Sequence, residues 1–356
     1  MNRCSAALFC VAQLAWFAAS AAPPTFIDPL DQPSAVLRAS RQGELMDVVD
    51  TGKRLVAVGP GGYIVVSDDQ GNTWVQKPSP VSSDLTAVAF ATAEQGWAIG
   101  HDGVVLHTAD GGSTWVKQMD GRLLATQLQP YYQKRAAEGD AKASRFLPEA
   151  AQLASDPAAF PLFDVWFKND QEGFVVGAFN LILHTVDGGK TWQPWMERTN
   201  NPQRYHLYSI TGGRAGVFIA GELGLLLRLD SQGLSFDALE SPYQGSFFGV
   251  MTRNDQVVAF GLRGNAFESS DGGQHWLRLQ NGTDVTLAAG ALLADGAVML
   301  LDQDGQLLTA APGQSRLVAE TTSTRLPATA LVVSVSKKQI TLVGPFGARI
   351  APLNKS

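Results

Sequence analysis

The chain has 356 residues, of which 45% are hydrophobic and 17% charged, and its formal net charge is -6. This ordinary globular composition excludes a disordered chain, and the acidic balance excludes a large non-specific nucleic-acid footprint, which needs a basic surface. The 36 glycines are typical of an all-β protein with many tight turns.

The first 22 residues have the pattern of a secretory signal peptide. Arg3 supplies a positive charge, residues 6–19 form an apolar stretch, and residues 19–21 (Ala-Ser-Ala) provide a small-residue cleavage site. The apolar stretch is too short to span a bilayer. We therefore expect export to the periplasm, with residues 23–356 forming one mature domain.

Both cysteines, Cys4 and Cys10, lie inside this N-terminal segment, and the bulky Phe9 before Cys10 argues against a lipoprotein signal. The mature chain would then contain no disulfide and no thiolate metal site. Its stability would depend on its hydrophobic core alone.

After an isolated strand candidate at residues 33–38, one pattern of strands recurs along the chain. Each unit has an apolar strand, a second that ends in glycine, a third, and then a motif that ends in tryptophan. Clear units occupy residues 45–74, 85–115, 163–192 and 247–276, degenerate units 206–236 and 286–313, and a partial unit 330–351. Four strands in about 40 residues are typical of β-propeller blades.

The partial unit has only three strand candidates, and residues 33–38 at the other end of the chain could supply a fourth. Pairing the two ends would close a ring and remove exposed sheet edges. The sequence thus predicts an all-β, seven-bladed β-propeller of four-stranded blades whose last blade is closed by the N-terminal strand. A linear β-solenoid is the alternative, but its ends need no complementary strands.

Residues 120–161 interrupt the repeat between the second and third blades. Their stretches 123–128, 131–139 and 148–154 are rich in alanine, leucine and glutamine, as helices are. We expect a helical insertion. Insertions in repeat proteins lie on one face, which is often the binding face.

Four copies of the motif [Ser/Thr]-x-Asp-x-Gly-x-[Thr/His]-Trp fit a hairpin between the last two strands of a blade. The glycine suits a positive φ, the aspartate can accept hydrogen bonds from turn amides, and the tryptophan can pack between blades. We interpret the aspartates as structural, because they would lie in separate blades. The motif residues are Asp69, Gly71, Trp74, Asp110, Gly112, Trp115, Asp187, Gly189, Trp192, Asp271, Gly273 and Trp276.

These motifs resemble the Asp-box, or BNR, repeat of sialidases and related propellers. The seven units, the signal peptide, the strand at 33–38 and the stretch Gly261-Leu-Arg-Gly-Asn265 are similar to the Ycf48/Hcf136 family of photosystem II stability and assembly factors. The resemblance implies a scaffold whose arginine-rich face holds a client protein. Arg263 occupies the matching stretch, and the further candidates are Arg253, Arg349, Arg38 and Arg214. The alternative is that each is a solvated loop arginine.

We therefore expect a non-catalytic, monomeric scaffold that binds an envelope or membrane protein. In a photosynthetic host the resemblance implies a photosystem II subunit as client and a location like the thylakoid lumen. In another host an inner-membrane transporter or other membrane complex would take that place.

The alternative function is that of a carbohydrate-active propeller, either a sialidase-like glycosidase or a glycan-binding protein. A sialidase needs an arginine triad and a Tyr–Glu pair, and its usual Arg-Ile-Pro near the first blade is absent; residues 349–352 read Arg-Ile-Ala-Pro. The five histidines are scattered, and no cofactor or metal motif is found. We expect neither a cofactor nor a metal.

Overall fold

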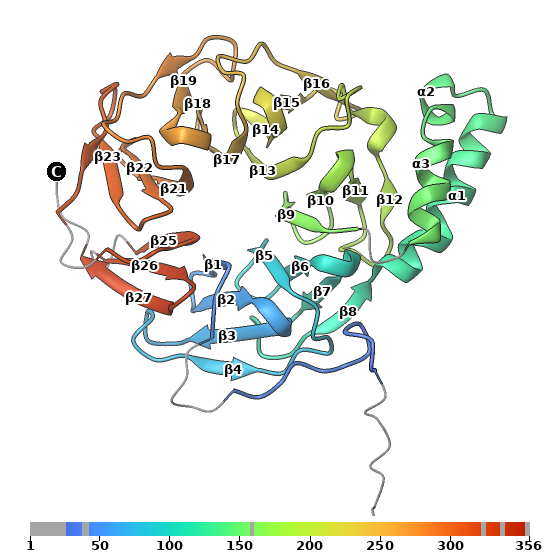
Figure 1. Ribbon diagram of the computed structural model, residues 1–356, viewed down its shortest axis with the longest axis horizontal. Coiled ribbons are helices and arrows are strands. Elements are labelled where there is room, and N and C mark those ends of the chain that lie inside the picture. Colours follow the sequence, from blue (N-terminus) through green and yellow to red (C-terminus); the bar gives the residue numbers. More distant parts are fainter. Residues whose placement is uncertain (1–25, 38–42, 157–159, 322–324, 335–338, 353–356) are drawn as a thin grey trace, which may run out of the picture.

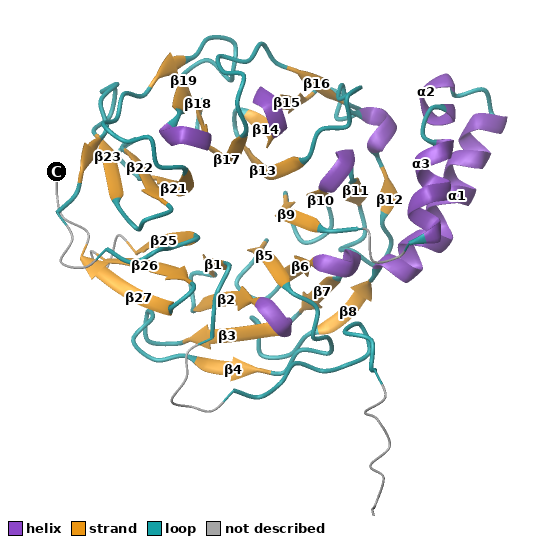
Figure 2. Cartoon of the chain, viewed as in Figure 1, coloured by secondary structure: helices purple, strands orange, loops and turns teal. Residues whose placement is uncertain are grey.

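The strands form seven antiparallel sheets, arranged as a ring around a central axis (Figures 1 and 2). The computed structural model describes residues 26–37, 43–156, 160–321, 325–334 and 339–352. The chain passes around the ring once, so consecutive sheets lie side by side (Figure 1). The seven-bladed propeller predicted from the repeats is confirmed.

The first four blades each contain four strands in chain order from the centre outward. Their strands are β1 (Asp47–Asp50), β2 (Leu55–Gly59), β3 (Tyr63–Ser67), β4 (Val75–Lys77); β5 (Leu85–Phe90), β6 (Gly96–Gly100), β7 (Val105–Thr108), β8 (Val116–Met119); β9 (Leu162–Phe167), β10 (Gly173–Gly177), β11 (Ile182–Thr185), β12 (Gln193–Pro194); and β13 (Leu207–Gly213), β14 (Gly216–Gly221), β15 (Leu226–Leu229), β16 (Phe236–Ala238).

Two further four-stranded blades and one three-stranded sheet complete the ring. Their strands are β17 (Phe247–Arg253), β18 (Gln256–Gly261), β19 (Ala266–Ser269), β20 (Leu277–Arg278); β21 (Leu287–Leu292), β22 (Val298–Asp302), β23 (Leu307–Ala310), β24 (Val318–Ala319); and β25 (Ala330–Ser334), β26 (Gln339–Gly344), β27 (Gly347–Pro352).

The second strand of a blade is the most buried. In β2, β6 and β10 every residue is buried, because a neighbouring blade covers each face of the sheet. Such strands are continuous apolar runs rather than alternating ones. The closed ring therefore places most of the apolar residues of the repeats between blades.

Single turns of 3-10 helix join the second and third strands of the first five blades. These are η1 (Pro60–Gly62), η2 (His101–Gly103), η3 (Ala178–Asn180), η5 (Glu222–Gly224) and η6 (Leu262–Gly264), whereas η4 (Met196–Arg198) follows β12. Since the strands are antiparallel, these turns lie on one edge of the ring, which we call the turn edge. The motif hairpins lie on the opposite, Asp-box edge.

The insertion between β8 and β9 is helical, as the sequence predicts. It contains α1 (Gly121–Ala137), α2 (Ala141–Ser144) and α3 (Leu147–Ser155), which lie outside the ring beside β12 (Figure 2). Asp120 caps α1 by accepting the Leu123 N–H at 3.0 Å. Leu128 and Tyr132 are fully buried in the core of the second and third blades. The helices are thus packed onto the propeller.

The predicted closing strand differs from the structure. Residues 33–37 are not a strand of the seventh sheet; the Ser34 N–H bonds to the Ser79 carbonyl, and the Leu37 N–H to Gln76 Oε1, at the outer edge of the first blade. Arg38 lies outside the described residues. The seventh and first blades instead meet through Leu45, whose N–H bonds to the Gly344 carbonyl at 3.1 Å.

Candidate binding surface

Each Asp box is a hairpin held by its own side chains. In the second blade, Asp110 Oδ1 accepts the Thr114 N–H at 2.9 Å and Thr108 Oγ1 accepts the Gly112 N–H at 2.9 Å. Gly112 has a φ of 85°, where a Cβ would be strained. Trp115 donates its ring N–H to the Gly112 carbonyl at 3.1 Å. These aspartates are therefore engaged as acceptors within their turns.

The other boxes repeat this geometry with two differences. Asp69, Asp187 and Asp271 accept equivalent amides at 2.8–3.0 Å. Trp74 bonds to its glycine carbonyl, whereas the ring N–H groups of Trp192 and Trp276 have no hydrogen-bond partner in the described chain. In the degenerate fourth box, Phe236 replaces the tryptophan and is fully buried.

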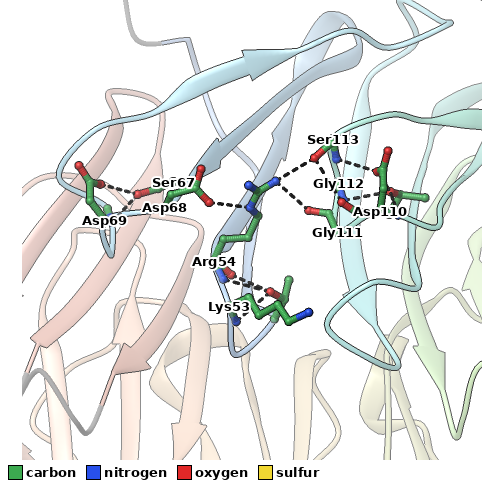
Figure 3. A network of polar contacts seen from close by, with 12 residues as sticks. Lys53, Arg54, Ser67, Asp68, Asp69, Asp110, Gly111, Gly112 and Ser113 are labelled. Carbon is green, nitrogen blue, oxygen red and sulfur yellow. Dashed lines mark hydrogen bonds and ion pairs between the residues drawn. The ribbon is translucent and has the colours of Figure 1, made fainter.

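An arginine outside the motif links two Asp boxes, as Figure 3 shows. Arg54, between β1 and β2, donates to Asp68 of its own blade at 2.7 Å and to Ser113 of the next blade at 3.0 Å. Arg228 in β15 likewise donates to the Gly272 carbonyl of the fifth blade at 3.2 Å. Arginines on the Asp-box edge thus join neighbouring blades.

The structure does not bring the sequence-predicted arginines together. Arg263 is exposed in η6 on the turn edge, whereas Arg214, in the turn after β13, and Arg253, the last residue of β17, are exposed on the Asp-box edge. Arg349 in β27 donates to the Leu326 and Pro327 carbonyls. Arg38 is not described. The described candidates therefore do not share one surface, and a binding role for each stays a prediction.

A cluster of aromatic side chains lies on the turn edge of the third to fifth blades, near the central opening. It contains Phe163 of β9, Phe179 of η3, His206 and Tyr208 at the start of β13, and Phe248 of β17, and we call it the aromatic surface. The Phe163 and Tyr208 ring centroids are 5.8 Å apart, and those of Tyr208 and Phe248 are 5.2 Å apart. The Phe179 ring lies 4.6 Å from the His206 ring.

Backbone strain marks the same part of the turn edge. Phe179, Leu223 and Arg263 occupy equivalent positions in three consecutive turns, with φ values of 54°, 50° and 54°. A bulky residue at positive φ is unusual, and Phe179 and Leu223 are also 62% and 52% exposed. The first blade places Gly61 there. Strained, exposed apolar residues point to a role other than folding.

Hydrogen bonds fix the aromatic surface in place. The Phe179 N–H donates to His206 Nδ1 at 2.9 Å, and the His206 N–H donates to Glu222 Oε2 at 3.3 Å. Burial, with a smaller contribution from the Glu222 carboxylate, raises the pKa of Tyr208. The surface is thus apolar at its centre, with Glu222 beside it, and Arg263 lies in the next turn along the same edge.

Two carboxylates of the innermost strands serve as links between blades. Asp47 Oδ2 accepts the Val88 N–H at 2.9 Å, and Asp164 Oδ2 accepts the Ile210 N–H at 2.8 Å. Burial raises the pKa of Asp47 to about 6 and that of Asp164 to about 7. Both carboxylates are engaged with backbone amides of the next blade.

The described residues contain no group of three or more His, Cys, Asp or Glu side chains placed to hold a metal ion. Within the same residues, no helix is long and apolar enough to cross a membrane.

The aromatic surface was not predicted from the sequence, although a signal exists. Aligned on their inner strands, the repeats place Phe163, Tyr208 and Phe248 at one position, where the first two blades have Met46 and Thr86. An aromatic residue at that position in three consecutive units indicates a continuous patch beside the central opening.

A closed ring of seven blades with Asp-box hairpins and an aromatic surface at one edge defines a BNR-type β-propeller. The sequence profile of the family described as "Photosynthesis system II assembly factor YCF48" matches residues 25–109, 57–131 and 149–246, together more than half of the chain. The chain belongs to this family.

Curated relatives match over shorter stretches. The photosystem II assembly protein Ycf48 of Synechococcus sp. (strain JA-2-3B'a(2-13)) is 34% identical over 70 residues, 20% of this chain and 21% of the relative. The photosystem II assembly lipoprotein Ycf48 of Synechococcus sp. (strain CC9902) is 28% identical over 133 residues, 36% of this chain and 38% of the relative. The matches thus span about a fifth to two fifths of these relatives.

Solved structures agree on the fold. A structure described as YCF48 bound to D1 peptide aligns with a TM-score of 0.64 at 15% identity, covering 91% of this chain and 99% of that one. The WD40 propeller domain of Doa1 aligns with a TM-score of 0.61 at 10% identity, covering 92% and 97%. At these identities the likeness shows the propeller fold alone.

Proposed function

We propose that this protein is a non-catalytic exported assembly factor that binds an extended segment of a membrane-protein client on the aromatic surface. The observation that carries this proposal is the continuous set of partly exposed rings across three blades, next to the strained, exposed side chains of Phe179 and Leu223. Aromatic residues and arginine are enriched in protein interfaces, and aromatic anchors contribute most of the binding energy.

The chemistry of the surface defines the kind of segment that fits. Its apolar centre suits large apolar side chains of the client, and Arg263, exposed in η6 on the same edge, suits a carboxylate. The similar YCF48 propeller is described as bound to a D1 peptide, which supports a peptide ligand for this chain. The client would be a photosystem II subunit in a photosynthetic host, and a transporter or other membrane complex elsewhere.

Export would bring the protein to the side of the membrane on which such a segment of the client is exposed. The pattern of the first 22 residues supports export, and two relatives are named as lipoproteins. The location would be the periplasm, or the thylakoid lumen in a photosynthetic host.

The test is affinity purification of the full chain from detergent-solubilised membranes. Glycine tolerates positive φ, so the double variant Phe179→Gly/Leu223→Gly removes two apolar side chains without new strain. We expect it to lose the client that the wild-type protein retains. The matched control, Val116→Ala/Val318→Ala, shortens exposed apolar residues of outer strands and should retain the client.

Arg263 is tested separately against an exposed arginine of an outer strand. We expect Arg263→Glu to weaken client binding and Arg278→Glu in β20 to leave it unchanged. Capture of the same partners by the wild-type protein and by the glycine double variant would overturn the aromatic surface as the binding site. Turnover of a sialoside panel by the pure protein would overturn the non-catalytic assignment.

A further inference from the structure

We propose that a cleft between the helical insertion and the fourth blade binds a phosphate-type oxyanion. The cleft has a volume of about 380 Å³. Its walls are α2 with the turn that follows it, the loop 197–204, and the outer strand β16. This position is at the outer rim of the ring, and no residue of the aromatic surface lines it.

The charge of the lining is opposite to that of the whole chain. Four cationic side chains line the cleft but only two carboxylates do, although the chain carries a net charge of -6. The cations are Lys142, Arg145, Arg198 and Arg204, and the carboxylates are Glu197 and Asp237. The lining is therefore positive overall and favours an anion.

The ion pairs inside the protein leave two of these cations without an acidic partner. Arg204 pairs with Glu149, and Arg198 lies 3.5 Å from Glu197, which it shares with Arg135 at 3.5 Å. Over the described residues, Lys142 and Arg145 form no ion pair, and both are exposed at the mouth of the cleft. They supply the charge that an added anion would meet.

The wall formed by the propeller is rigid before any ligand arrives. Asn180 and Asn201 are buried, and Asn201 Nδ2 donates to Asn180 Oδ1 at 2.9 Å and to the Tyr205 carbonyl at 2.9 Å. Thr199 donates to Asn180 Oδ1 at 2.9 Å. This network fixes the loop, so little ordering entropy would be lost on binding.

The wall formed by the insertion is fixed by a buried carboxylate. Glu197 accepts the Tyr131 hydroxyl at 2.9 Å and the Tyr132 hydroxyl at 3.0 Å, which joins α1 to η4. Asp140 caps α2 by accepting the Lys142 and Ala143 amides. The two walls are thus held at a defined separation.

The chemistry of the cleft selects the ligand class. Lys142 and Arg145, the two lining cations without an acidic partner, match the charge of a doubly charged phosphate group, whereas one carboxylate would neutralise only half of it. Arginine forks are suited to phosphate oxygens, and the volume fits a small group. The phosphate could belong to a free phosphate compound or to the headgroup of a lipid such as phosphatidic acid.

The experiment compares two double variants with the same change of charge. Lys142→Glu/Arg145→Glu alters the cleft, and Arg214→Glu/Arg253→Glu alters exposed arginines on the Asp-box edge. Inorganic phosphate is titrated by calorimetry, and co-sedimentation uses phosphatidylcholine vesicles with and without phosphatidic acid. Unfolding curves check that both variants are folded.

We expect the dissociation constant for phosphate to rise about tenfold or more in the cleft variant. In the control variant it should change little. Binding only to vesicles that contain phosphatidic acid, lost in the cleft variant, assigns the headgroup as the source and supports the proposal. No binding in either arm, or equal losses in both variants, overturns it. Capture of an acidic peptide by the cleft without competition from phosphate also overturns it.

Discussion

Arg54 and Ser113 belong to neighbouring blades and are joined by a hydrogen bond of 3.0 Å from Arg54 Nη1 to Ser113 Oγ. The same guanidinium donates to Asp68 at 2.7 Å, so one side chain connects two consecutive Asp boxes (Figure 3). An arginine can do this because its planar fork offers several donors in fixed directions.

We expect Arg54→Ala to lower the free energy of unfolding by about 1–2 kcal/mol, because it removes hydrogen bonds that hold two blades together. The control is Arg253→Ala at the end of β17, whose guanidinium donates to the Leu292 carbonyl at the long distance of 3.5 Å. That variant should stay within about 0.5 kcal/mol of the wild type. Chemical denaturation measures both, and equal losses would contradict the linking role of Arg54.

The partly buried carboxylates of the inner strands predict that stability falls as pH rises. Burial raises the folded-state pKa of Asp47 to about 6 and of Asp164 to about 7. Between pH about 4 and these values the folded protein holds protons that the unfolded chain releases. Each pH unit in that window therefore removes up to about 1.4 kcal/mol per group.

This prediction is checked by thermal unfolding between about pH 5 and pH 8, where the wild type should melt at a lower temperature as pH rises. In Asp47→Asn/Asp164→Asn the dependence should be flatter, since neither side chain titrates. Asp237→Asn, an exposed change, should keep the wild-type slope. A double variant with an unchanged slope would assign the effect to other groups.

In the strained turn of the fourth blade, a substitution should not destabilise the protein, in contrast to Arg54→Ala. Leu223 has a φ of 50°, and a left-handed backbone costs a bulky residue about 1–2 kcal/mol. Replacement by glycine removes this strain, but it raises the entropy of the unfolded chain, which costs about 0.5–1 kcal/mol of stability. We therefore expect Leu223→Gly to leave stability unchanged or to raise it slightly.

The matched control for Leu223→Gly is Leu277→Gly in β20. The two leucines are similarly exposed, at 52% and 56%. Leu277 lies in a strand, where glycine relieves no strain and only raises the entropy of the unfolded chain. Leu277→Gly should lose about 1 kcal/mol. If denaturation showed equal losses in the two variants, strain at Leu223 would not be significant.

The fold could be predicted because six of the seven blades carry the complete pattern of four strands. Even the degenerate fourth box keeps Asp230, which accepts the Leu234 N–H at 2.9 Å. The path of residues 33–37 could not be predicted, because pairing between the two ends of the chain depends on contacts that no local motif encodes. Ser34 and Leu37 bond to the first blade instead.

The binding residues were harder to predict than the fold. The turn motif of residues 261–265 identified Arg263. Arg253 lies on the opposite edge because neighbouring strands of a blade run in opposite directions. Arg349 donates to carbonyls 22 and 23 residues earlier in the chain, and no local pattern predicts those contacts. Exposure of Phe179 and Leu223 depends on the way three blades meet, although both residues occur where the first repeat has glycine.

The junction between the seventh and first blades should be the least stable part of the ring. Within the described chain, the seventh sheet has three strands, and the junction is held by packing of Leu45 and Val343 and by a hydrogen bond from Thr329 to the Leu45 carbonyl at 3.0 Å. Regions with fewer buried contacts open at lower free energy. We therefore expect the amides of β25–β27 to exchange with deuterium faster than those of β9–β11.

Mass spectrometry of hydrogen exchange measures this difference directly. Leu45→Ala should raise exchange in β1 and β25 further, because truncating a buried leucine costs about 2–5 kcal/mol. The matched change Leu85→Ala, at the equivalent position of the second blade, should raise exchange around β5 and leave β25–β27 near the wild-type rate. Uniform protection around the ring, or loss of protection in every blade on Leu45→Ala, would show that the junction is not a separate point of opening.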